Sequence, residues 1–346
     1  MHELQVEFQT KLKNFSLNMQ FSMGEECLGI LGASGCGKSM TLKTIAGIAT
    51  PDCGRIRTES AIFYDKAQKI NLAPQKRRVG YLFQNYALFP NMTVEENIAA
   101  GLREKKRGGR QKVEKLLEQF KLAGLEKQYP YRLSGGQQQR TALARILASQ
   151  PEILLLDEPF SAMDSYLKEE LQLELKEHLQ NFEGCTIIVS HDRDEIYKLC
   201  DKTMVMEDGM NVICDGTRAL FDQPRRVTAA RLTGCKNLSR AEKTGTQSVY
   251  AADWGVMFKV TRKIPEKLAY IGIRAHDFLP VNDGKEEENT IRILPEEKTE
   301  APFEWTLLFR NADNAKGCMW MKRERGDTQI PEKVRVNPDK ILLLEE

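Results

Sequence analysis

Residues 32–39 read GASGCGKS and combine three glycines with a lysine and two serines. They fit the pattern G-x-x-x-x-G-K-S/T, in which glycines let backbone N–H groups turn inward around phosphate oxygens. We expect Lys38 to neutralise the outer phosphates and the Ser39 hydroxyl to bind Mg²⁺. The residues expected to hold the polyphosphate of a nucleotide are Gly32, Ala33, Ser34, Gly35, Cys36, Gly37, Lys38, Ser39 and Met40.

A second set of polar residues, Asp157 and Glu158, follows the stretch PEILLL at 151–156, whose last four residues form a continuous apolar run. A completely apolar strand is typical of a parallel sheet covered on both faces, whose carboxyl edge lies beside a phosphate loop. We expect Asp157 to hold Mg²⁺ directly or through water. We expect Glu158 to act as the general base for water that attacks the terminal phosphate.

The flanks of the phosphate loop have the elements that must position it. Residues 27–31, CLGIL, form a short apolar run that predicts a buried strand, and residues 40–46 have helical spacing. The amino end of that helix adds positive potential to the anion site. Alone, this context predicts nucleotide binding and no particular reaction.

The stretch LSGGQQQR at 133–140 narrows the function. A serine and two glycines at the start of a helix make a second N–H-rich anion site. The stretch resembles the signature motif of the ATP-binding cassette (ABC) ATPases. In that family the motif contacts the γ-phosphate of the ATP held by the other subunit, which implies a homodimer. The residues that the resemblance assigns to this contact are Ser134, Gly135, Gly136 and Gln137.

Three further segments resemble landmarks of the same family. Gln84, in LFQNYALFP, resembles the Q-loop glutamine, which contacts the metal and the attacking water, while the loop beyond it meets the membrane subunit. Residues 161–164, SAMD, resemble the D-loop, with Met163 where leucine is usual, and assign Asp164 to the nucleotide site. His191, after the apolar run IIVS, resembles the switch histidine that contacts the γ-phosphate.

The residue that contacts adenine is not identified by its motif. The family usually places an aromatic residue in the first hairpin, and the corresponding place falls near Leu12. Three alternatives remain: Phe15 stacks on the base, Phe8 does so, or Leu12 gives apolar contact alone.

The chain of 346 residues is long enough for two domains. The resemblance covers about residues 1–235 and implies an α/β fold, a P-loop ATPase core with a parallel sheet and a helical subdomain. We expect an ATP-binding domain at 1–233, with the helical subdomain at about 86–149. A small all-β, barrel-like regulatory domain is expected at 234–346.

The expected β-domain shows period-two alternation, which is typical of short strands. Its segment Gly272–His276 looks like the GIRPE-type strand in the regulatory β-domain of importer ATPases. We see no repeated halves, so this domain either binds an effector or merely dimerises the ATPase. The alternating residues are Val256, Phe258 and Val260; Phe303, Trp305, Leu307 and Phe309; Cys318 and Trp320; Ile341 and Leu343.

Charge and composition exclude several classes of protein. The 51 basic and 49 acidic residues leave a formal charge of +2, which argues against a surface that wraps nucleic acid. The basic cluster at 103–110 is interpreted as a solvated loop rather than a nucleic-acid site. Eight cysteines without a C-x-x-C pair indicate reduced thiols. The amino-terminal residues lack the apolar core of a signal peptide, and no run of about 18 apolar residues occurs.

These observations favour the ATP-hydrolysing subunit of an ABC importer, with ATP and Mg²⁺ as cofactors. Its expected partners are transmembrane permease subunits, a solute-binding protein and a second copy of the chain, with no nucleic acid. It is expected to be cytoplasmic, peripheral on the inner face of the cell membrane. The details place it closest to the molybdate/sulfate oxyanion importers, while polyamine, iron and sugar importers are alternatives.

Two other classes fit the sequence less well. Cassette ATPases of DNA repair need long coiled-coil insertions between residues equivalent to Lys38 and Ser134, and those of translation carry two cassettes in one chain. Neither feature is present. A P-loop kinase that phosphorylates a small molecule would leave the LSGGQQQR stretch unexplained.

Overall fold

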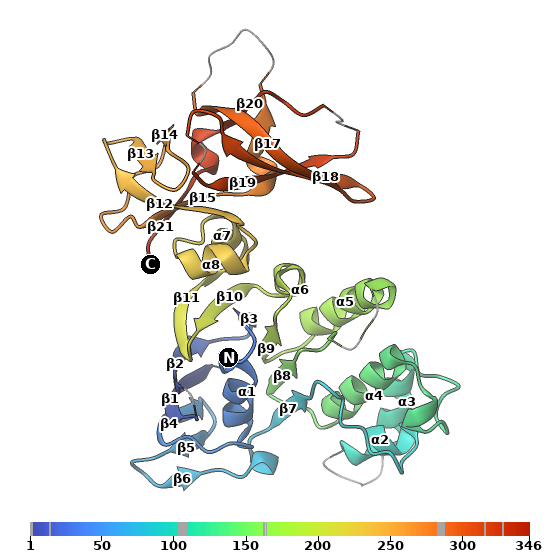
Figure 1. Ribbon diagram of the computed structural model, residues 1–346. Coiled ribbons are helices and arrows are strands. Elements are labelled where there is room, and N and C mark those ends of the chain that lie inside the picture. The colour runs from blue at the N-terminus through green and yellow to red at the C-terminus, as the bar shows by residue number, and fades with distance from the viewer. Residues whose placement is uncertain are drawn as a thin grey trace. The chain divides into compact units, whose positions relative to one another are not determined.

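The computed structural model divides into two compact units, Met1–Thr217 and Arg218–Glu346 (Figure 1). The division falls before residue 233, so the segment 218–233 belongs to the second unit. The first unit is α/β and the second is largely β, as the sequence predicts. The residues that the structure describes are 3–13, 15–102, 109–161, 163, 165–281, 288–314, 316–326 and 329–346.

The first unit is built on one mixed sheet, which has eleven strands in the described residues. The segment β10-β3-β9-β8-β7 is parallel, which confirms the predicted parallel sheet, and β6 to β2 form an antiparallel extension. The strands in sheet order are β6 (Ile70–Asn71), β5 (Ile62–Asp65), β4 (Cys53–Thr58), β1 (Leu4–Lys11), β2 (Ser16–Met23), β11 (Met210–Gly216), β10 (Lys202–Glu207), β3 (Cys27–Gly32), β9 (Cys185–Ser190), β8 (Ile153–Asp157) and β7 (Val79–Leu82).

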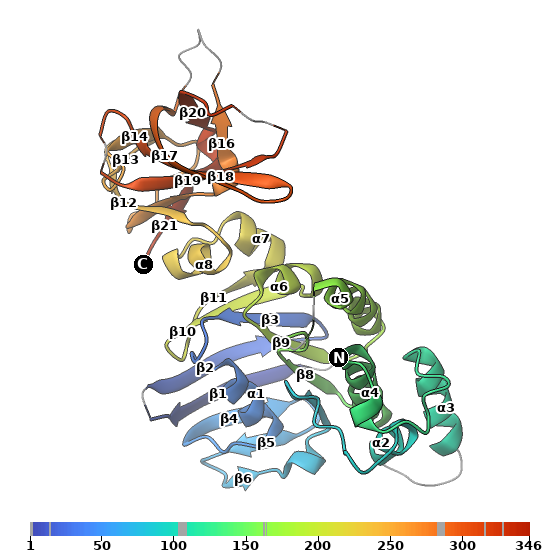
Figure 2. The ribbon, with the colours of Figure 1, turned by 45° about the vertical axis from the view of Figure 1, so that its right-hand side comes forward.

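The parallel strands end together at one edge of the sheet. Every residue of β3, β8 and β9 is buried, because the strands are covered on both faces. Leu31 lies opposite Ser190, and Asp157 lies opposite Val189. Figure 2 shows β3, β9 and β8 running side by side. The loops that follow these strands therefore leave the sheet at the same edge, where ligands bind in open α/β sheets.

Helices of the first unit fall into two groups. α2, α3 and α4 contact one another and form the predicted helical subdomain, which Figure 1 shows beside the end of the sheet near β7. The others connect or cover strands. The helices are α1 (Lys38–Ala46), α2 (Val94–Ala100), α3 (Gly109–Gln119), α4 (Gly135–Ala148), α5 (Ser165–Gln180) and α6 (Arg193–Leu199), with 3₁₀ turns η1 (Pro74–Lys76) and η2 (Pro130–Arg132).

The second unit contains two antiparallel sheets, each of five strands in the described residues. Side chains of both, such as Ile271 and Phe309, share one core, so the predicted all-β domain is confirmed. The first sheet is β14 (Val256–Lys259), β13 (Ser248–Ala251), β12 (Asn237–Lys243), β15 (Tyr270–Ile273) and β21 (Leu342–Leu344). The second is β16 (Phe278–Pro280), β20 (Lys333–Val336), β17 (Thr290–Glu300), β18 (Glu304–Asn311) and β19 (Cys318–Glu324). The remaining elements are α7 (Thr217–Asp222), α8 (Val227–Leu232), η3 (Ala275–Asp277) and η4 (Pro338–Lys340).

The alternating residues Cys318 and Trp320 do not face the core of this unit. On β18, Trp305, Leu307 and Phe309 are buried, as alternation predicts. On β19 the buried residues are Met319 and Met321, so Cys318 and Trp320 lie on the outer face of the sheet. Both faces of β19 carry apolar residues, and period two alone cannot choose between them.

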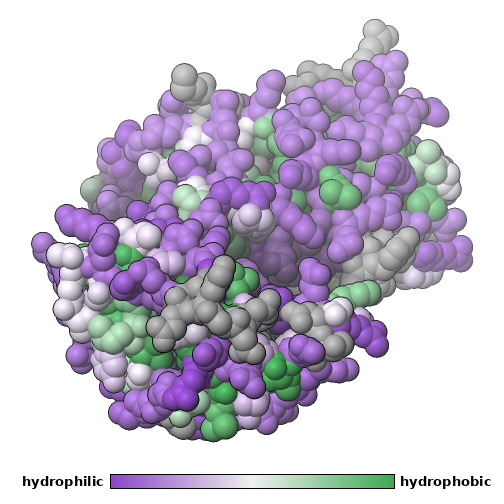
Figure 3. Space-filling model, turned by 90° about the horizontal axis from the view of Figure 1, so that it is seen from above, coloured by the Kyte–Doolittle hydropathy of each residue, from purple (hydrophilic) through white to green (hydrophobic). Residues whose placement is uncertain are grey.

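The described helices include none that is long and apolar enough to cross a membrane. The face drawn in Figure 3 is mainly hydrophilic, and hydrophobic residues show on it in small separate groups.

A buried arginine completes the carboxyl end of α1. The Arg77 guanidinium, 1% exposed, donates to the carbonyl oxygens of Thr44 at 3.0 Å and Ile45 at 2.8 Å. It also donates to the Leu72 carbonyl at 2.8 Å and to Asn71 Oδ1 at 3.0 Å. Burial lowers the pKa of Arg77 to about 10, so the group stays charged at neutral pH. Arg77 therefore supplies a donor to the Ile45 carbonyl at the helix end and a second donor to the Thr44 carbonyl, which also accepts from the Gly47 N–H at 3.1 Å.

We expect Arg77→Met to lower the free energy of unfolding by about 3 kcal/mol, because it leaves buried carbonyls unpaired. The matched control is Arg78→Met, whose exposed ion pair with Glu152 is worth less than about 1 kcal/mol. Urea unfolding followed by circular dichroism measures both. Equal midpoints for the two variants would contradict the structural role of Arg77.

Candidate active site

The phosphate loop joins β3 to α1. Its backbone is left-handed at Gly35, with φ 83°, and at Gly37, with φ 109°. A Cβ atom at Gly37 would also lie 2.9 Å from Leu17 Cδ1, so the position excludes larger residues on two grounds. Ala33, Ser34 and Gly35 are exposed at the tip of the loop, where their N–H groups can reach a ligand.

The Lys38 side chain folds back over this loop. It is 6% exposed, and its ammonium group donates to the Gly32 carbonyl at 2.7 Å and to the Ala33 carbonyl at 2.9 Å. The group therefore lies at the amino end of α1, beside N–H groups that have no partner within the helix. This concentration of donors and positive charge can bind a polyphosphate.

Two loop residues contribute packing rather than polar side chains. Cys36 belongs to the core of the first unit, and burial raises the pKa of its thiol, against a lowering effect of Lys38. Met40 is partly buried and packs against the same core. We conclude that backbone groups are what these two positions can offer a nucleotide.

Asp157 ends β8 and receives two hydrogen bonds. The Ser39 hydroxyl donates to Asp157 Oδ1 at 2.7 Å, and the Tyr81 hydroxyl donates to Asp157 Oδ2 at 2.9 Å. Burial, and next the charge of Asp157, raise the pKa of Tyr81, so the phenol remains a donor. A hydroxyl and a carboxylate in contact are hard oxygen donors of the kind that Mg²⁺ prefers, and the pair fits that ion.

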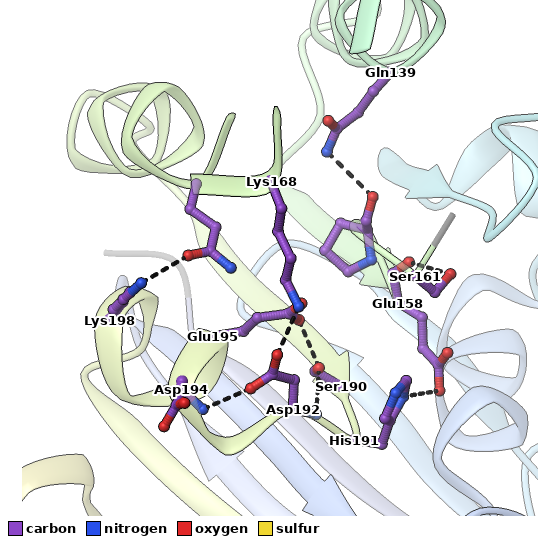
Figure 4. A network of polar contacts seen from close by, with 12 residues as sticks. Gln139, Glu158, Ser161, Lys168, Ser190, His191, Asp192, Asp194, Glu195 and Lys198 are labelled. Carbon is purple, nitrogen blue, oxygen red and sulfur yellow. Dashed lines mark hydrogen bonds and ion pairs between the residues drawn. The ribbon is translucent and has the colours of Figure 1, made fainter. Parts of the chain in front are cut away.

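Glu158 leaves the strand in a left-handed conformation, with φ 48°. Its N–H donates to the Val189 carbonyl at 2.9 Å, which fixes the turn against β9. One carboxylate oxygen, Oε1, lies 3.2 Å from His191 Nδ1. The other, Oε2, accepts from Gln84 Nε2 at 3.5 Å. Figure 4 shows the imidazole and the carboxylate pointing toward one another.

Pro159, directly after Glu158, connects the site to the helical subdomain. Its carbonyl accepts from Gln139 Nε2 of α4 at 3.3 Å (Figure 4) and from the Tyr86 hydroxyl at 3.5 Å. Arg145, also on α4, donates to the carbonyls of Tyr86 at 2.9 Å and Ala87 at 2.8 Å. One helix thus holds the backbone that follows both Gln84 and Glu158.

The signature residues lie at the amino end of α4. Ser134 caps the helix: its hydroxyl accepts from the Gln137 N–H at 3.3 Å, and its N–H donates to Gln137 Oε1 at 2.9 Å. Gly135 is exposed, with open space where a Cβ would lie. In the described hydrogen bonds, Ser134 and Gln137 have partners only within this helix.

The predicted residues thus fall into three groups. The structure brings together the phosphate loop, Asp157, Glu158, Gln84 and His191 at the carboxyl edge of the sheet. Ser134, Gly135, Gly136 and Gln137 lie on α4, away from these contacts. Asp164 lies outside the described residues.

Sequence reasoning missed two residues of the site. Tyr81 on β7 has the appearance of an ordinary strand aromatic, and Gln139 stands inside a run of three glutamines. A signal for Tyr81 exists in retrospect: it lies on the strand that delivers Gln84, and parallel pairing puts that strand next to β8.

The structure also narrows the choice of a residue that contacts a base. Phe8 is 1% exposed and lies in the core of the sheet, so it cannot stack on a ligand. Phe15 is half-buried, and its ring lies 3.5 Å from where a Cβ of Gly37 would stand. Leu12 is partly buried in the same turn, and its side chain can offer a base apolar contact alone. Phe15 and Leu12 therefore remain as candidates.

Comparison with known proteins places these features in one family. A family model described as ABC transporter matches residues 12–161. A sulfate/thiosulfate import ATP-binding protein of Chromobacterium violaceum is 40% identical over 73% of this chain and 68% of its own length. A spermidine/putrescine import ATP-binding protein of Oleidesulfovibrio alaskensis is 39% identical over 64% of this chain, which spans 59% of that relative. An Fe(3+) ions import ATP-binding protein of Haemophilus influenzae is 37% identical over 65% of this chain and 64% of its own length.

A solved structure is also similar. It is a dimeric ATP-binding cassette in a post-hydrolysis state, bound to ADP and Pi, with 27% sequence identity and a TM-score of 0.52. The match covers 63% of this chain and 99% of that chain.

We expect Lys38→Met to weaken ATP binding in the presence of EDTA by at least about tenfold, because it removes a charge-assisted contact to the phosphates. Isothermal titration calorimetry measures the affinity. Lys43→Met, on the same helix, is the matched control and is expected to bind as the wild type does. Unchanged affinity of Lys38→Met would mean that the loop does not hold the phosphates.

Proposed function

Because the chain belongs to the ABC transporter family of ATP-binding proteins, whose members are ATPases, we propose that it is the ATP-hydrolysing subunit of an importer. The observation that carries the proposal is the pair of adjacent carboxylates beside the phosphate loop. Asp157 contacts Ser39 of that loop, and Glu158 is held between His191 and Gln84.

In the proposed site, the backbone N–H groups of residues 32–40 and the Lys38 ammonium bind the phosphates of ATP. Ser39 and Asp157 would hold Mg²⁺, with Gln84 near it. When bound there, Mg²⁺ supplies positive charge to the terminal phosphates. Phe15 or Leu12 contacts the base.

The hydrolytic step rests on Glu158. Its carboxylate accepts a proton from the water that attacks the terminal phosphate, and Gln84 orients that water. The His191 contact, at 3.2 Å, holds the carboxylate and presents the imidazole to the γ-phosphate. The two carboxylates have different roles because their neighbours differ. Two hydroxyl groups fix Asp157, which suits it to hold Mg²⁺. Gln84 and His191, which can reach the substrate, flank Glu158, which suits it to act as the base.

We place the second half of each site on a second copy of the chain. Ser134–Gln137 lie at the amino end of α4 and not on the sheet that carries the phosphate loop. In a dimer, these residues of one copy can contact the γ-phosphate of the ATP bound by the other copy. Asp164 would lie at the same interface. The similarity to a dimeric cassette supports this arrangement. Closing and reopening of the dimer would move membrane permease subunits.

The proposed solute is an oxyanion of the sulfate/molybdate type, delivered by a solute-binding protein. Relatives named for sulfate/thiosulfate, polyamine and iron import have similar identities, so polyamine or iron is the alternative. The proposed location is the cytoplasmic face of the cell membrane. The second unit, Arg218–Glu346, would be the regulatory domain.

We expect Glu158→Gln to lower ATP turnover by at least about 100-fold, because the amide cannot accept the proton of the attacking water. The variant should bind ATP and elute from a size-exclusion column as an ATP-dependent dimer. Glu183→Gln, an exposed carboxylate elsewhere in the unit, serves as control. Normal turnover by Glu158→Gln, with no dimer, would remove Glu158 from the mechanism.

The solute proposal predicts that millimolar sulfate or molybdate slows ATP turnover by the full chain at least about twofold, because a regulatory domain that binds the transported solute would couple that binding to the ATPase. Spermidine at the same ionic strength should have no effect. Colorimetric phosphate release measures both. Inhibition by spermidine alone would reverse the assignment in favour of the polyamine class.

A further inference from the structure

An ion cluster lies behind His191, between α5, the end of β9 and the start of α6 (Figure 4). The Lys168 ammonium on α5 lies 2.6 Å from Asp192 Oδ2 and 2.6 Å from Glu195 Oε1. The two carboxylates belong to the segment that follows the histidine. One cation therefore links α5 to the residue after the histidine and to the first turn of α6.

The cluster continues into the backbone on the other side of His191. The Ser190 hydroxyl donates to Glu195 Oε2 at 2.6 Å and accepts from the Asp192 N–H at 2.9 Å. Ser190 and Glu195 are both buried. The residues before and after the histidine are thus joined to the same carboxylate, directly or through one serine.

The charges in this cluster depend on one another. Burial lowers the pKa of Lys168, but its hydrogen bonds to Asp192 and Glu195 outweigh burial and raise the pKa overall. Burial raises the pKa of Asp192, but the Lys168 contact and hydrogen bonds from the backbone N–H groups of Asp194 and Glu195 together outweigh burial and lower the pKa. The side chain of Glu195 is only 4% exposed, so removing its cation would leave a buried carboxylate without a charge partner.

The His191 side chain is 58% exposed. Among the described residues, its ring lies against Glu158, with Nδ1 3.2 Å from Oε1. A ring in solvent keeps a fixed direction only if the backbone that carries it is fixed. The groups that hold that backbone include the buried Ser190 and Glu195, together with the partly exposed Lys168 and Asp192.

We propose that Lys168 and Glu195 are positioning residues for His191, which hold the turn 190–192 where the imidazole meets Glu158. This inference rests on the proposed function, since it assumes that His191 and Glu158 act in ATP hydrolysis. It adds a link from α5, the helix that follows residues 161–164, to the catalytic pair. A movement of α5 would then reach the histidine through one ammonium group.

A second contact between the same helices provides a control. Lys198 on α6 donates to Gln172 on α5 at 3.2 Å, one turn farther from His191. It joins α5 to α6 without touching the turn 190–192. Lys198→Met therefore tests packing of the helix pair alone.

The variants to compare are Glu195→Gln, Lys168→Met, Lys168→Arg and Lys198→Met, each measured by steady-state ATP turnover. We expect kcat to fall about tenfold in Glu195→Gln and Lys168→Met, with KM for ATP changed less than about twofold, because the phosphate loop and Lys38, which the variants leave intact, supply most of the contacts that bind ATP in the proposed site. Lys168→Arg should restore most of the turnover, and Lys198→Met should match the wild type.

The decisive comparison repeats Glu195→Gln and Lys168→Met in a His191→Ala background. If they act through the histidine, neither should lower kcat further there. An equal loss in both backgrounds, or a rise in KM equal to the fall in kcat, would overturn the proposal. Urea midpoints identify a variant that folds poorly. If Lys168→Met folds poorly, Glu195→Gln decides; if Glu195→Gln folds poorly, the comparison of Lys168→Met with Lys168→Arg decides.

The same experiments separate this inference from the proposed function. If the wild type does not hydrolyse ATP, the proposed function fails. If the wild type hydrolyses ATP and His191→Ala retains full turnover, the proposed function stands, while the role of His191 and the inference that depends on it fail. If His191→Ala loses turnover while Glu195→Gln and Lys168→Met keep theirs, only the positioning role of the cluster fails.

Discussion

β8 has no side that faces solvent: all five of its residues are buried, and the first charges it can carry come where it reaches the edge of the sheet. There it ends in two consecutive carboxylates, each contacted by two side chains. Ser39 and Tyr81 hold Asp157, while His191 and Gln84 hold Glu158. These side chains follow or belong to β3, β7 and β9, so the parallel register of the strands brings distant positions of the chain into one site. The burial of β8 therefore determines where the chemistry can be.

The helical subdomain has a different relation to the same residues. It holds backbone rather than side chains: Gln139 donates to the carbonyl after Glu158, and Arg145 donates to the turn after Gln84. The sheet fixes the positions of the carboxylates, and α4 fixes the direction in which the chain leaves them. Since α4 begins with the signature residues, a force applied to its amino end is transmitted to both loops through a few hydrogen bonds.

Much of the site could be predicted because its constraints are local. Continuous apolar runs identify β3, β8 and β9, and fixed glycine and lysine positions identify the phosphate loop. Tyr81, Lys168 and Glu195 could not be identified, since an aromatic in a strand and charges on helices have many ordinary uses, and only the tertiary pairing distinguishes them. The buried face of β19 could not be chosen from the sequence for a related reason: Met319 and Met321 alternate as regularly as Cys318 and Trp320 do. Phe8 shows the same limit, because a sequence does not say which aromatic in a hairpin is buried.

The left-handed backbone of Glu158 has a further consequence. A residue with a β-carbon is strained by roughly 1–2 kcal/mol in that conformation, and glycine or asparagine adopts it more easily. The hydrogen bond from its N–H to Val189 and the packing of β8 and β9 must offset this strain. Selection for stability alone would replace the glutamate, whereas selection for hydrolysis would retain it. At this one position the requirements of folding and of turnover are opposed. The surrounding sheet supplies the stability that lets the chain retain a glutamate in a strained backbone conformation.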